Sequence, residues 1–460
     1  MMRRFRCTVC GYVHEGDEPP DECPVCGAAR EAFVLETEIS PAHEPVASPT
    51  FVRSGDGSAG PKLLILGGGI AGLSAAEAAR DLSPEAVITL VHREPALPYY
   101  RLSLTRYLAG ALTKDHLLIR ARPWFEERRI RLVHAEARRL DRSRRLVVLD
   151  DGSMLPYDRL LVATGAHPHV PAIAGVRFLG VHVLRTLDDA DAILERARRG
   201  ANCVCIGGGL LGLETAGALA RRGLAVIVLE EAGRLLPRQL AGSAAARLAD
   251  HLGKLGIDVR TAVKVTEIVG DDGVRAVRLA DGTEVPADLV IIAAGVRPNT
   301  DLGRAAGLAV NRGLVVNDGL QTNDPDVLAA GDVAEHRGIV WGLWTVAAEQ
   351  GALAGRAMAG AAVTYEGNPP ATYLKVVELP VFSVGRFEAE TPADRIIERA
   401  DEARLVRILL RDGRVAGGNL VGDPALADAL QRAVQEHLPL AAVPELCFPA
   451  GDAKQDIKTQ

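Results

Sequence analysis

The pattern of apolar and polar positions contains one arrangement twice. Residues 62–82 read KLLILGGGIAGLSAAEAARDL, which is an apolar run, a glycine turn and an alanine-rich segment. Residues 201–231 read ANCVCIGGGLLGLETAGALARRGLAVIVLEE, repeat that order and add a second apolar run. A short apolar run that ends in a glycine turn is typical of a buried parallel strand followed by a helix. The pattern therefore predicts an α/β protein with two Rossmann-like units in tandem.

The C-terminal part of the chain has a different character. From residue 361 onward neither glycine pattern recurs. Residues 373–386 and 405–422 read as antiparallel strands, and residues 423–438 read as an amphipathic helix after an Asp-Pro start. We expect a small α+β domain in this part of the chain.

Four cysteines mark the N-terminal unit, residues 1–38. They form two Cys-x-x-Cys pairs with twelve residues between them, Cys7 with Cys10 and Cys23 with Cys26. Two such pairs on facing turns offer four thiolates in a tetrahedron, which suits iron or zinc. A unit this small needs a bound metal for stability, because it cannot bury enough apolar surface alone. The knuckles CTVCGY and CPVCG resemble those of rubredoxins, which implies iron, and a zinc ribbon is the alternative.

Composition narrows the classes of partner. The net charge is −6 and the pI is near 6.0, which argues against nucleic acid as the main partner. No apolar run approaches the roughly 18–20 residues of a membrane span, and the start MMRRFRCTVC has no secretory pattern. Seven cysteines in 460 residues form no disulfide framework, so we expect a reducing cytoplasm. No pattern indicates the oligomeric state.

The first glycine turn has the spacing G-x-G-x-x-G at Gly67, Gly69 and Gly72. In its strand–helix context this spacing lets the backbone approach a pyrophosphate at a helix N-terminus. A ribose-binding acid is expected roughly twenty residues on. The following strand ends at His92, so we take Glu94 as the candidate acid.

The second turn repeats the spacing at Gly207, Gly209 and Gly212, and its following strand ends at Glu230. A carboxylate there accepts both ribose hydroxyls and repels a 2′-phosphate, which favours NADH over NADPH. Arg234 follows shortly and is the residue that could receive such a phosphate instead.

Two further stretches, LLVATGAHP (160–168) and VLAAGDVAEH (327–336), resemble the ATG and GD motifs of FAD-dependent pyridine-nucleotide oxidoreductases. The resemblance implies FAD, with Asp332 on the ribityl chain and Glu214 near the nicotinamide and the flavin. A helix beginning near Thr345 would direct its N-terminal dipole at the flavin, with Trp344 beside the ring. Trp341 is better explained by core packing. The cofactor contacts implied are Gly67, Gly69, Ile70, Ala71, Gly72, Glu94, Arg101, Thr164, Gly165, Gly331, Asp332 and Trp344 for FAD, and Gly207, Gly209, Leu210, Leu211, Gly212, Glu230 and Gly295 for NADH.

A redox-active cysteine beside the flavin is not expected. Residues 61–202 contain no cysteine, Cys203 and Cys205 lie within a predicted strand, and Cys447 lies in the tail. Instead, YYRLSLTRYLAG (99–110) resembles the Tyr-x-Arg-x-x-Leu stretch of NADH:rubredoxin reductases, oxygenase-type ferredoxin reductases and the front part of the nitrite reductase large subunit.

Within that stretch Tyr99, Arg101 and Leu104 match the family pattern. Arg106 stands where ferredoxin reductases often have lysine, and we expect it to be able to pair with Glu214 as a second catalytic group.

The expected domains follow from these assignments. They are a rubredoxin-like metal domain at 1–38, a linker at 39–61, an FAD-binding domain at 62–170 and 288–360, an NAD-binding domain at 171–287, and an α+β domain at 361–460.

The predicted function is an NADH-dependent flavoprotein reductase. It would pass electrons from NADH through FAD to its own tethered iron centre, and then to a partner protein such as a diiron peroxide or oxygen reductase. The alternative is a flavin NADH oxidase or peroxidase with a structural zinc ribbon that recruits a partner. The acidic loop 14–22 is a candidate for docking on the arginine-rich segments 119–132 and 136–145, with solvated surface as the equal alternative.

Overall fold

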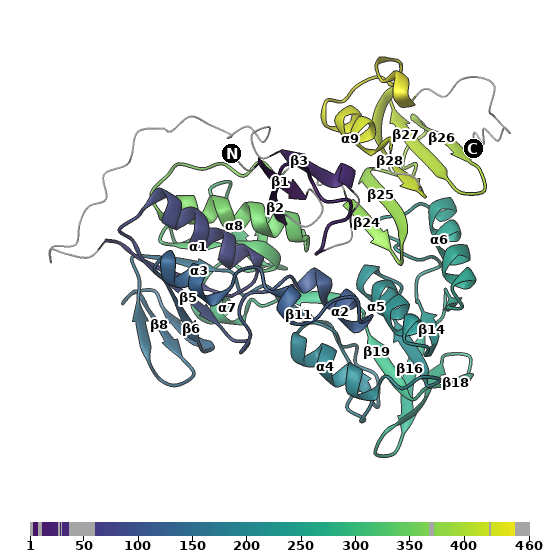
Figure 1. The fold of residues 1–460 in the computed structure, drawn as a ribbon, viewed down its shortest axis with the longest axis horizontal. Coiled ribbons are helices and arrows are strands. Elements are labelled where there is room, and N and C mark those ends of the chain that lie inside the picture. The colour runs from purple at the N-terminus through teal and green to yellow at the C-terminus, as the bar shows by residue number, and fades with distance from the viewer. Residues whose placement is uncertain are drawn as a thin grey trace.

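Four folded parts are visible in the computed structural model (Figure 1). The structure describes residues 3–7, 12–25, 28, 30–35, 60–367, 372–422 and 425–446. In the view of Figure 1 the three N-terminal strands are drawn between α8 and the C-terminal domain. No helix in these ranges is long and apolar enough to cross a membrane.

The first parallel sheet has the strand order β22–β10–β4–β5–β6. The strands are β4 (Lys62–Leu66), β5 (Val87–His92), β6 (Ile130–His134), β10 (Arg159–Val162) and β22 (Val327–Ala329). The run Leu63–Leu66 is almost fully buried, as expected for a central strand that is covered on both faces. The helices of this domain are α1 (Ile70–Leu82), α3 (Arg122–Glu127), α7 (Asp301–Ala305) and α8 (Trp344–Met358).

The second parallel sheet has the strand order β12–β19–β13–β14–β15. The strands are β12 (Val181–His182), β13 (Asn202–Ile206), β14 (Ala225–Leu229), β15 (Asp258–Arg260) and β19 (Leu289–Ile292), and the helices are α4 (Leu187–Arg196), α5 (Leu210–Arg221) and α6 (Gly242–Lys254). The two sheets confirm the predicted tandem α/β architecture.

One predicted domain boundary is wrong. The FAD-binding domain was expected to resume at residue 288, but β19 pairs in parallel with β13 and β12 and so belongs to the second sheet. The chain returns through β20 (Val296–Pro298), which pairs antiparallel with β11 (Ala166–Pro168). The apolar run at 289–292 could not show from sequence alone which sheet it joins.

Smaller strand groups complete the two domains. They are the antiparallel meanders β7 (Ala137–Asp141), β8 (Leu146–Leu149) and β9 (Met154–Pro156), then β16 (Val265–Gly270), β17 (Val274–Leu279) and β18 (Glu284–Pro286), and the parallel pair β21 (Leu314–Val316) and β23 (Ala334–His336). The short helix α2 (Leu104–Leu108) follows a single 3₁₀ turn, Arg101–Ser103.

Helices α1 and α8 cross at very short range. A Cβ at Gly351 or at Gly355 would lie 2.2 Å from the carbonyl oxygen of Ala71 or Ala75, respectively. Only glycine on one helix, facing alanine on the other, permits this approach. The crossing fixes the start of α8 relative to the glycine turn that precedes α1.

The C-terminal domain has the predicted α+β composition. Its antiparallel sheet has the order β24–β25–β28–β27–β26, with β24 (Thr372–Val376), β25 (Leu379–Gly385), β26 (Asp394–Ala400), β27 (Leu405–Arg411) and β28 (Arg414–Val421), and α9 (Ala427–Gln435) packs on β28 and β25. Val377 joins β24 to β25 and is 6% exposed, and a Cβ at Gly217 of α5 would lie 2.7 Å from its methyl carbon. This hairpin therefore packs directly against the second domain.

The N-terminal unit is a three-stranded antiparallel sheet in the order β2–β1–β3, with β1 (Arg3–Cys7), β2 (Val13–Gly16) and β3 (Phe33–Leu35). Two turns in it are closed in the same way. The backbone N–H of Cys7 donates to the Tyr12 oxygen at 2.8 Å, and that of Cys23 donates to the Ala28 oxygen at 2.7 Å. This internal repeat is the geometry expected of two matching knuckles.

Candidate active site and metal centre

The glycine turn after β4 is open to a ligand at one position and closed at two. Gly67 has φ +127°, and a Cβ there would lie 2.0 Å from the Ala163 oxygen. A Cβ at Gly72 would lie 1.9 Å from the Gly67 oxygen, so both positions require glycine. A Cβ at Gly69, the N-cap of α1, would meet no atom of the described residues within 4 Å. The turn presents open backbone at a helix N-terminus, which fits a pyrophosphate.

The turn after β13 has the same geometry. Gly207 has φ +117°, and a Cβ at Gly212 would lie 2.1 Å from the Gly207 oxygen. Gly209 is the N-cap of α5, and a Cβ there would meet nothing within 4 Å in the described part of the chain. Predicted contacts Ile70 and Ala71 form the first turn of α1, and Leu210 and Leu211 form that of α5.

The residue at the end of the second strand differs between the two domains. The carboxylate of Glu230 accepts the Gly208 N–H at 2.6 Å and the Ala232 N–H at 2.7 Å. His92 takes the corresponding place in the first domain, where a Cβ at Gly68 would lie 2.7 Å from the His92 Cβ. Burial lowers the pKa of His92 below its usual value, so its ring is neutral near pH 7.

Glu94, the predicted ribose acid, is held by two residues of the 99–110 stretch. The Tyr99 hydroxyl donates to its Oε2 at 2.6 Å, and the Arg101 guanidinium donates to its Oε1 and to the Arg185 carbonyl. Burial raises the pKa of Tyr99, which keeps the hydroxyl protonated as a donor. The structure therefore brings Glu94 and Arg101 together, and it adds Tyr99 to this group.

The ATG and GD motifs meet at one edge of the first sheet, since β10 and β22 are paired neighbours. Asp332 forms an ion pair with Arg185, with 3.1 Å between Oδ2 and Nη2. The Gly331 N–H donates to Gln350 Oε1 of α8 at 2.9 Å, and the Asn299 side-chain amide donates to the Thr164 oxygen at 2.7 Å.

Two predicted glycines lie in nearby turns with left-handed backbone, Gly165 at φ +68° and Gly295 at φ +95°. Helix α8 begins at Trp344, one residue before the predicted start. Trp341 packs against the core of the first domain, as expected.

Residues 99–107 contact three domains at once. The Thr105 hydroxyl lies 3.5 Å from the Glu214 carboxylate on α5, and the Tyr107 hydroxyl donates to Asp191 on α4 at 2.8 Å. Arg106 was expected to pair with Glu214. Instead, its guanidinium donates to the carbonyl oxygens of Cys23 and Pro24 in the metal domain, at 3.2 and 3.0 Å.

The knuckle cysteines can be placed in part. Cys7 and Cys23 are buried in one cluster with Phe5, Val25 and Phe33, and Tyr100 of the reductase belongs to the same cluster. Cys10 and Cys26 lie outside the described residues, as does Cys447. Two buried thiols on matching turns fit half of a tetrahedral thiolate site. Cys203 and Cys205 are fully buried in β13, as predicted.

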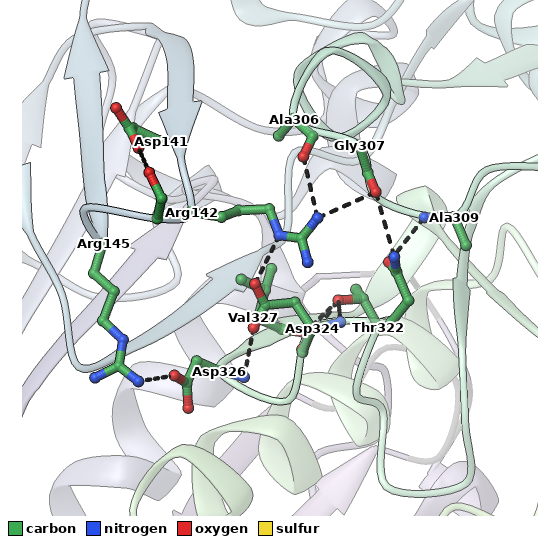
Figure 2. A network of polar contacts seen from close by, with 12 residues as sticks. Asp141, Arg142, Arg145, Ala306, Gly307, Ala309, Thr322, Asp324, Asp326 and Val327 are labelled. Atoms are coloured by element: carbon green, nitrogen blue, oxygen red, sulfur yellow. Dashed lines mark hydrogen bonds and ion pairs between the residues drawn. The ribbon is translucent and has the colours of Figure 1, made fainter.

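The arginine-rich segment 136–145 is part of the first domain's own structure. Arg142 donates to Asp324 at 2.7 Å and to the carbonyl oxygens of Ala306 and Gly307 at 3.2 Å (Figure 2). Arg145 bonds Asp326 on the same loop (Figure 2). These arginines fasten the β7–β8 hairpin to residues 306–327.

The acidic loop 14–22 also has partners of its own. Glu18 and Asp21 form ion pairs with Arg30 within the N-terminal unit. These two carboxylates therefore pair within the N-terminal unit and not with the segments 119–132 and 136–145 on which the loop was expected to dock. Sequence reasoning missed Tyr100, Ser103, Arg185, Asn299 and Gln350. Tyr100 and Ser103 stand at positions that the Tyr-x-Arg-x-x-Leu pattern leaves open, and the other three belong to none of the motifs described above.

Family models match three successive parts of the chain. The pyridine nucleotide-disulphide oxidoreductase model matches residues 61–351. The rubredoxin-like domain of rubrerythrin matches 5–34, and the C-terminal domain of rubredoxin NAD+ reductase matches 370–438. The chain belongs to the pyridine nucleotide-disulphide oxidoreductase family.

Individual relatives narrow the branch. The chain is 32% identical to the NADH-rubredoxin oxidoreductase of Clostridium acetobutylicum over 383 residues, covering 81% of this chain and 94% of that one. It is 36% identical to the nitrite reductase [NAD(P)H] of Bacillus subtilis over 82% of this chain and 47% of the relative. The chain thus spans about half the length of the nitrite reductases that it matches.

Two solved structures have the same fold. The crystal structure of the Clostridium acetobutylicum NADH:rubredoxin oxidoreductase superposes with a TM-score of 0.72 at 30% identity, over 82% of this chain and 96% of that one. A chain of the crystal structure of the covalent putidaredoxin reductase-putidaredoxin complex superposes with a TM-score of 0.77 at 31% identity, over 83% of this chain and 94% of that one.

Proposed function

We propose that this protein is an NADH-dependent flavoprotein reductase that delivers electrons from NADH, through FAD, to its own rubredoxin-type iron centre. The observation that supports this most directly is the position of Cys23. It lies in one buried cluster with Tyr100, and Trp344 at the start of α8 packs against that cluster. The helix whose N-terminus is expected at the flavin therefore also reaches the metal domain.

The residues present fit a dinucleotide in each α/β domain. Residues 67–72 would hold the FAD pyrophosphate, and Asp332 would meet the ribityl chain. Residues 207–212 would hold NADH, with Glu230 accepting the ribose hydroxyls. When bound, FAD would supply the chemistry that accepts two electrons from NADH and passes them on one at a time. The chain would position the FAD, and the positive end of α8 would lie near it and favour negative charge there.

The four knuckle cysteines would hold the iron. Cys7, Cys10, Cys23 and Cys26 supply four soft thiolates, and the matching turns at Cys7 and Cys23 support that arrangement. The match to a rubredoxin-like domain and the relationship to an NADH-rubredoxin oxidoreductase favour iron over zinc.

The onward acceptor in this proposal is a second protein, of a class such as a diiron peroxide or oxygen reductase. The low cysteine count supports a reducing compartment, the cytoplasm.

The proposal is tested by metal analysis combined with anaerobic titration by NADH. The visible spectra of flavin and iron should both bleach as NADH is added to the purified protein. Zinc alone, or iron that stays oxidised while the flavin bleaches, would overturn the proposal and favour the oxidase alternative with a structural zinc ribbon.

A further inference from the structure

The second knuckle is attached to the reductase by hydrogen bonds that no motif predicts. The Ser103 hydroxyl donates to the Val25 carbonyl oxygen at 2.7 Å, and Ser103 is only 1% exposed. Arg106 donates to the carbonyl oxygens of Cys23 and Pro24. Three consecutive carbonyls of one knuckle, from Cys23 to Val25, are therefore bound by two residues of one short helical segment.

An apolar contact lies beside these hydrogen bonds. Tyr100 is 6% exposed and shares a buried cluster with Val25 and Cys23. Its ring lies 5.9 Å from that of Trp344, at an interplanar angle of 33°. Tyr100, Ser103 and Arg106 follow one another at intervals of three residues, which places them on one face of the helical turn.

The chemistry of this contact is main-chain recognition. All three bound acceptors are backbone carbonyl oxygens, whereas the nearby acidic side chains Glu18 and Asp21 pair with Arg30. A serine hydroxyl and a forked guanidinium recognise the shape of a turn through such oxygens. They do not need a charged partner, so the contact depends little on ionic strength.

We propose that Tyr100, Ser103, Arg106 and Trp344 form a docking site for a Cys-x-x-Cys knuckle, with the chain's own second knuckle as its occupant. This docking site recognises the carbonyls of residues 23–25 and not the surface charge of the metal domain. The inference deepens the proposed function, on which it rests for the purpose of the contact. The contact itself does not depend on which metal the knuckles hold.

Hydrogen–deuterium exchange of the full, metal-loaded chain tests the docking site. In the double variant S103A/R106A, peptides covering residues 20–25 and 99–108 should exchange about tenfold faster than in the wild type, since two to three hydrogen bonds are lost. The matched control S143A/R144A makes the same two substitutions on an exposed turn and should leave both peptides unchanged. Wild-type protection in S103A/R106A would overturn the proposal.

A second measurement needs no variant. The protection of residues 20–25 in the wild type should change by less than about twofold between low and high salt. Loss of that protection at high salt would mean ionic docking and would contradict main-chain recognition. Unchanged exchange of α1 and α8 in S103A/R106A establishes that the variant is folded.

The outcomes separate this inference from the proposed function. A zinc-loaded protein with a protected knuckle would overturn the function and leave the docking site intact. If the iron bleaches with NADH but the knuckle amides are unprotected from exchange, the proposed function would stand and the docking site would be overturned.

Discussion

At the scale of single residues, Glu230 is a candidate nucleotide contact whose carboxylate is held in one orientation. Its two oxygens are oriented by the N–H groups of Gly208 and Ala232. Each such bond to a charged acceptor stabilises the orientation, and the remaining lone pairs stay available for ribose hydroxyls. In the proposed function, Glu230 would therefore contribute to NADH affinity through pre-orientation as well as through charge.

Replacing the Glu230 carboxylate should weaken the use of NADH and reduce the preference for NADH over NADPH. We expect Glu230→Ala to lower kcat/KM for NADH by about 10- to 100-fold, because one or two charge-assisted hydrogen bonds to the ribose would be lost. The neighbouring Glu231→Ala, which removes an exposed carboxylate, serves as the control and should change kcat/KM for NADH little. Steady-state kinetics with NADH and with NADPH test this prediction. An undiminished preference for NADH in Glu230→Ala would show that another residue selects the nucleotide.

His92 should make the first domain sensitive to mild acid. Its Nδ1 donates to the Glu94 carbonyl at 2.8 Å, and burial lowers its folded-state pKa below the ordinary value near 6.5. The unfolded chain therefore gains this proton first, so stability present above about pH 6.5 is lost as the pH falls toward the folded-state pKa.

His92→Asn keeps a donor and removes the titration. Its free energy of unfolding should fall less than that of the wild type between about pH 7.5 and 5.5, as measured by urea denaturation at each pH. Parallel declines in the two proteins would assign the acid sensitivity to other groups.

At the scale of elements, the crossing of α1 and α8 links the candidate FAD-binding turn to helix α8. Gly351 and Gly355 face Ala71 and Ala75 at a distance that no side chain fits. This spacing puts Gly351 of α8 against Ala71, in the first turn of α1, so the position of α8 is fixed relative to the turn at Gly67–Gly72.

Replacing a glycine at the contact between α1 and α8 by alanine should destabilise the protein, although alanine is the better helix former. Gly355→Ala would place a methyl group 2.2 Å from the Ala75 oxygen, and we expect a loss of about 1–3 kcal/mol. Gly253→Ala on α6, where a Cβ meets nothing within 4 Å of the described residues, should be neutral or stabilising by up to about 1 kcal/mol. The free energies of unfolding of both variants, measured by denaturant unfolding, test this prediction. Equal effects of the two substitutions would contradict the close crossing.

Local pattern predicted the elements well and their contacts poorly. The glycine turns at Gly67 and Gly207 were readable because strand, turn and helix are contiguous. The assignment of strand 289–292 was wrong because sheet membership depends on pairing between distant segments. Ser103 and Arg106 contact residues about 80 positions away, and only the folded chain brings those carbonyls to them.

At the scale of the whole molecule, one segment joins three domains. Tyr99 and Arg101 bond Glu94 of the first domain, Tyr107 bonds Asp191 of the second, and Ser103 bonds the metal domain. Any shift of this segment changes all three contacts. The described residues of the metal domain form a small buried cluster, so we expect its stability to depend on the metal and on this contact.

Loss of one thiolate should unfold the metal domain alone. In Cys23→Ser we expect amide protection of residues 3–7 and 12–25 to disappear, while the melting temperature of the reductase domains changes by less than about 2 °C. The exposed substitution Asp17→Ser in the same unit is the control and should retain protection. A protected N-terminal unit in Cys23→Ser would show that the sheet folds without its metal.

The use of carbonyl oxygens from Cys23 to Val25 has an evolutionary consequence. Every amino acid carries a backbone carbonyl, so the hydrogen bonds to the reductase do not constrain the side chains of the turn. Selection then acts on the path of the turn, on the metal-binding cysteines and on the apolar contact of Val25 with Tyr100. A foreign domain with the same turn could therefore replace the native one by gene fusion, without any redesign of the reductase.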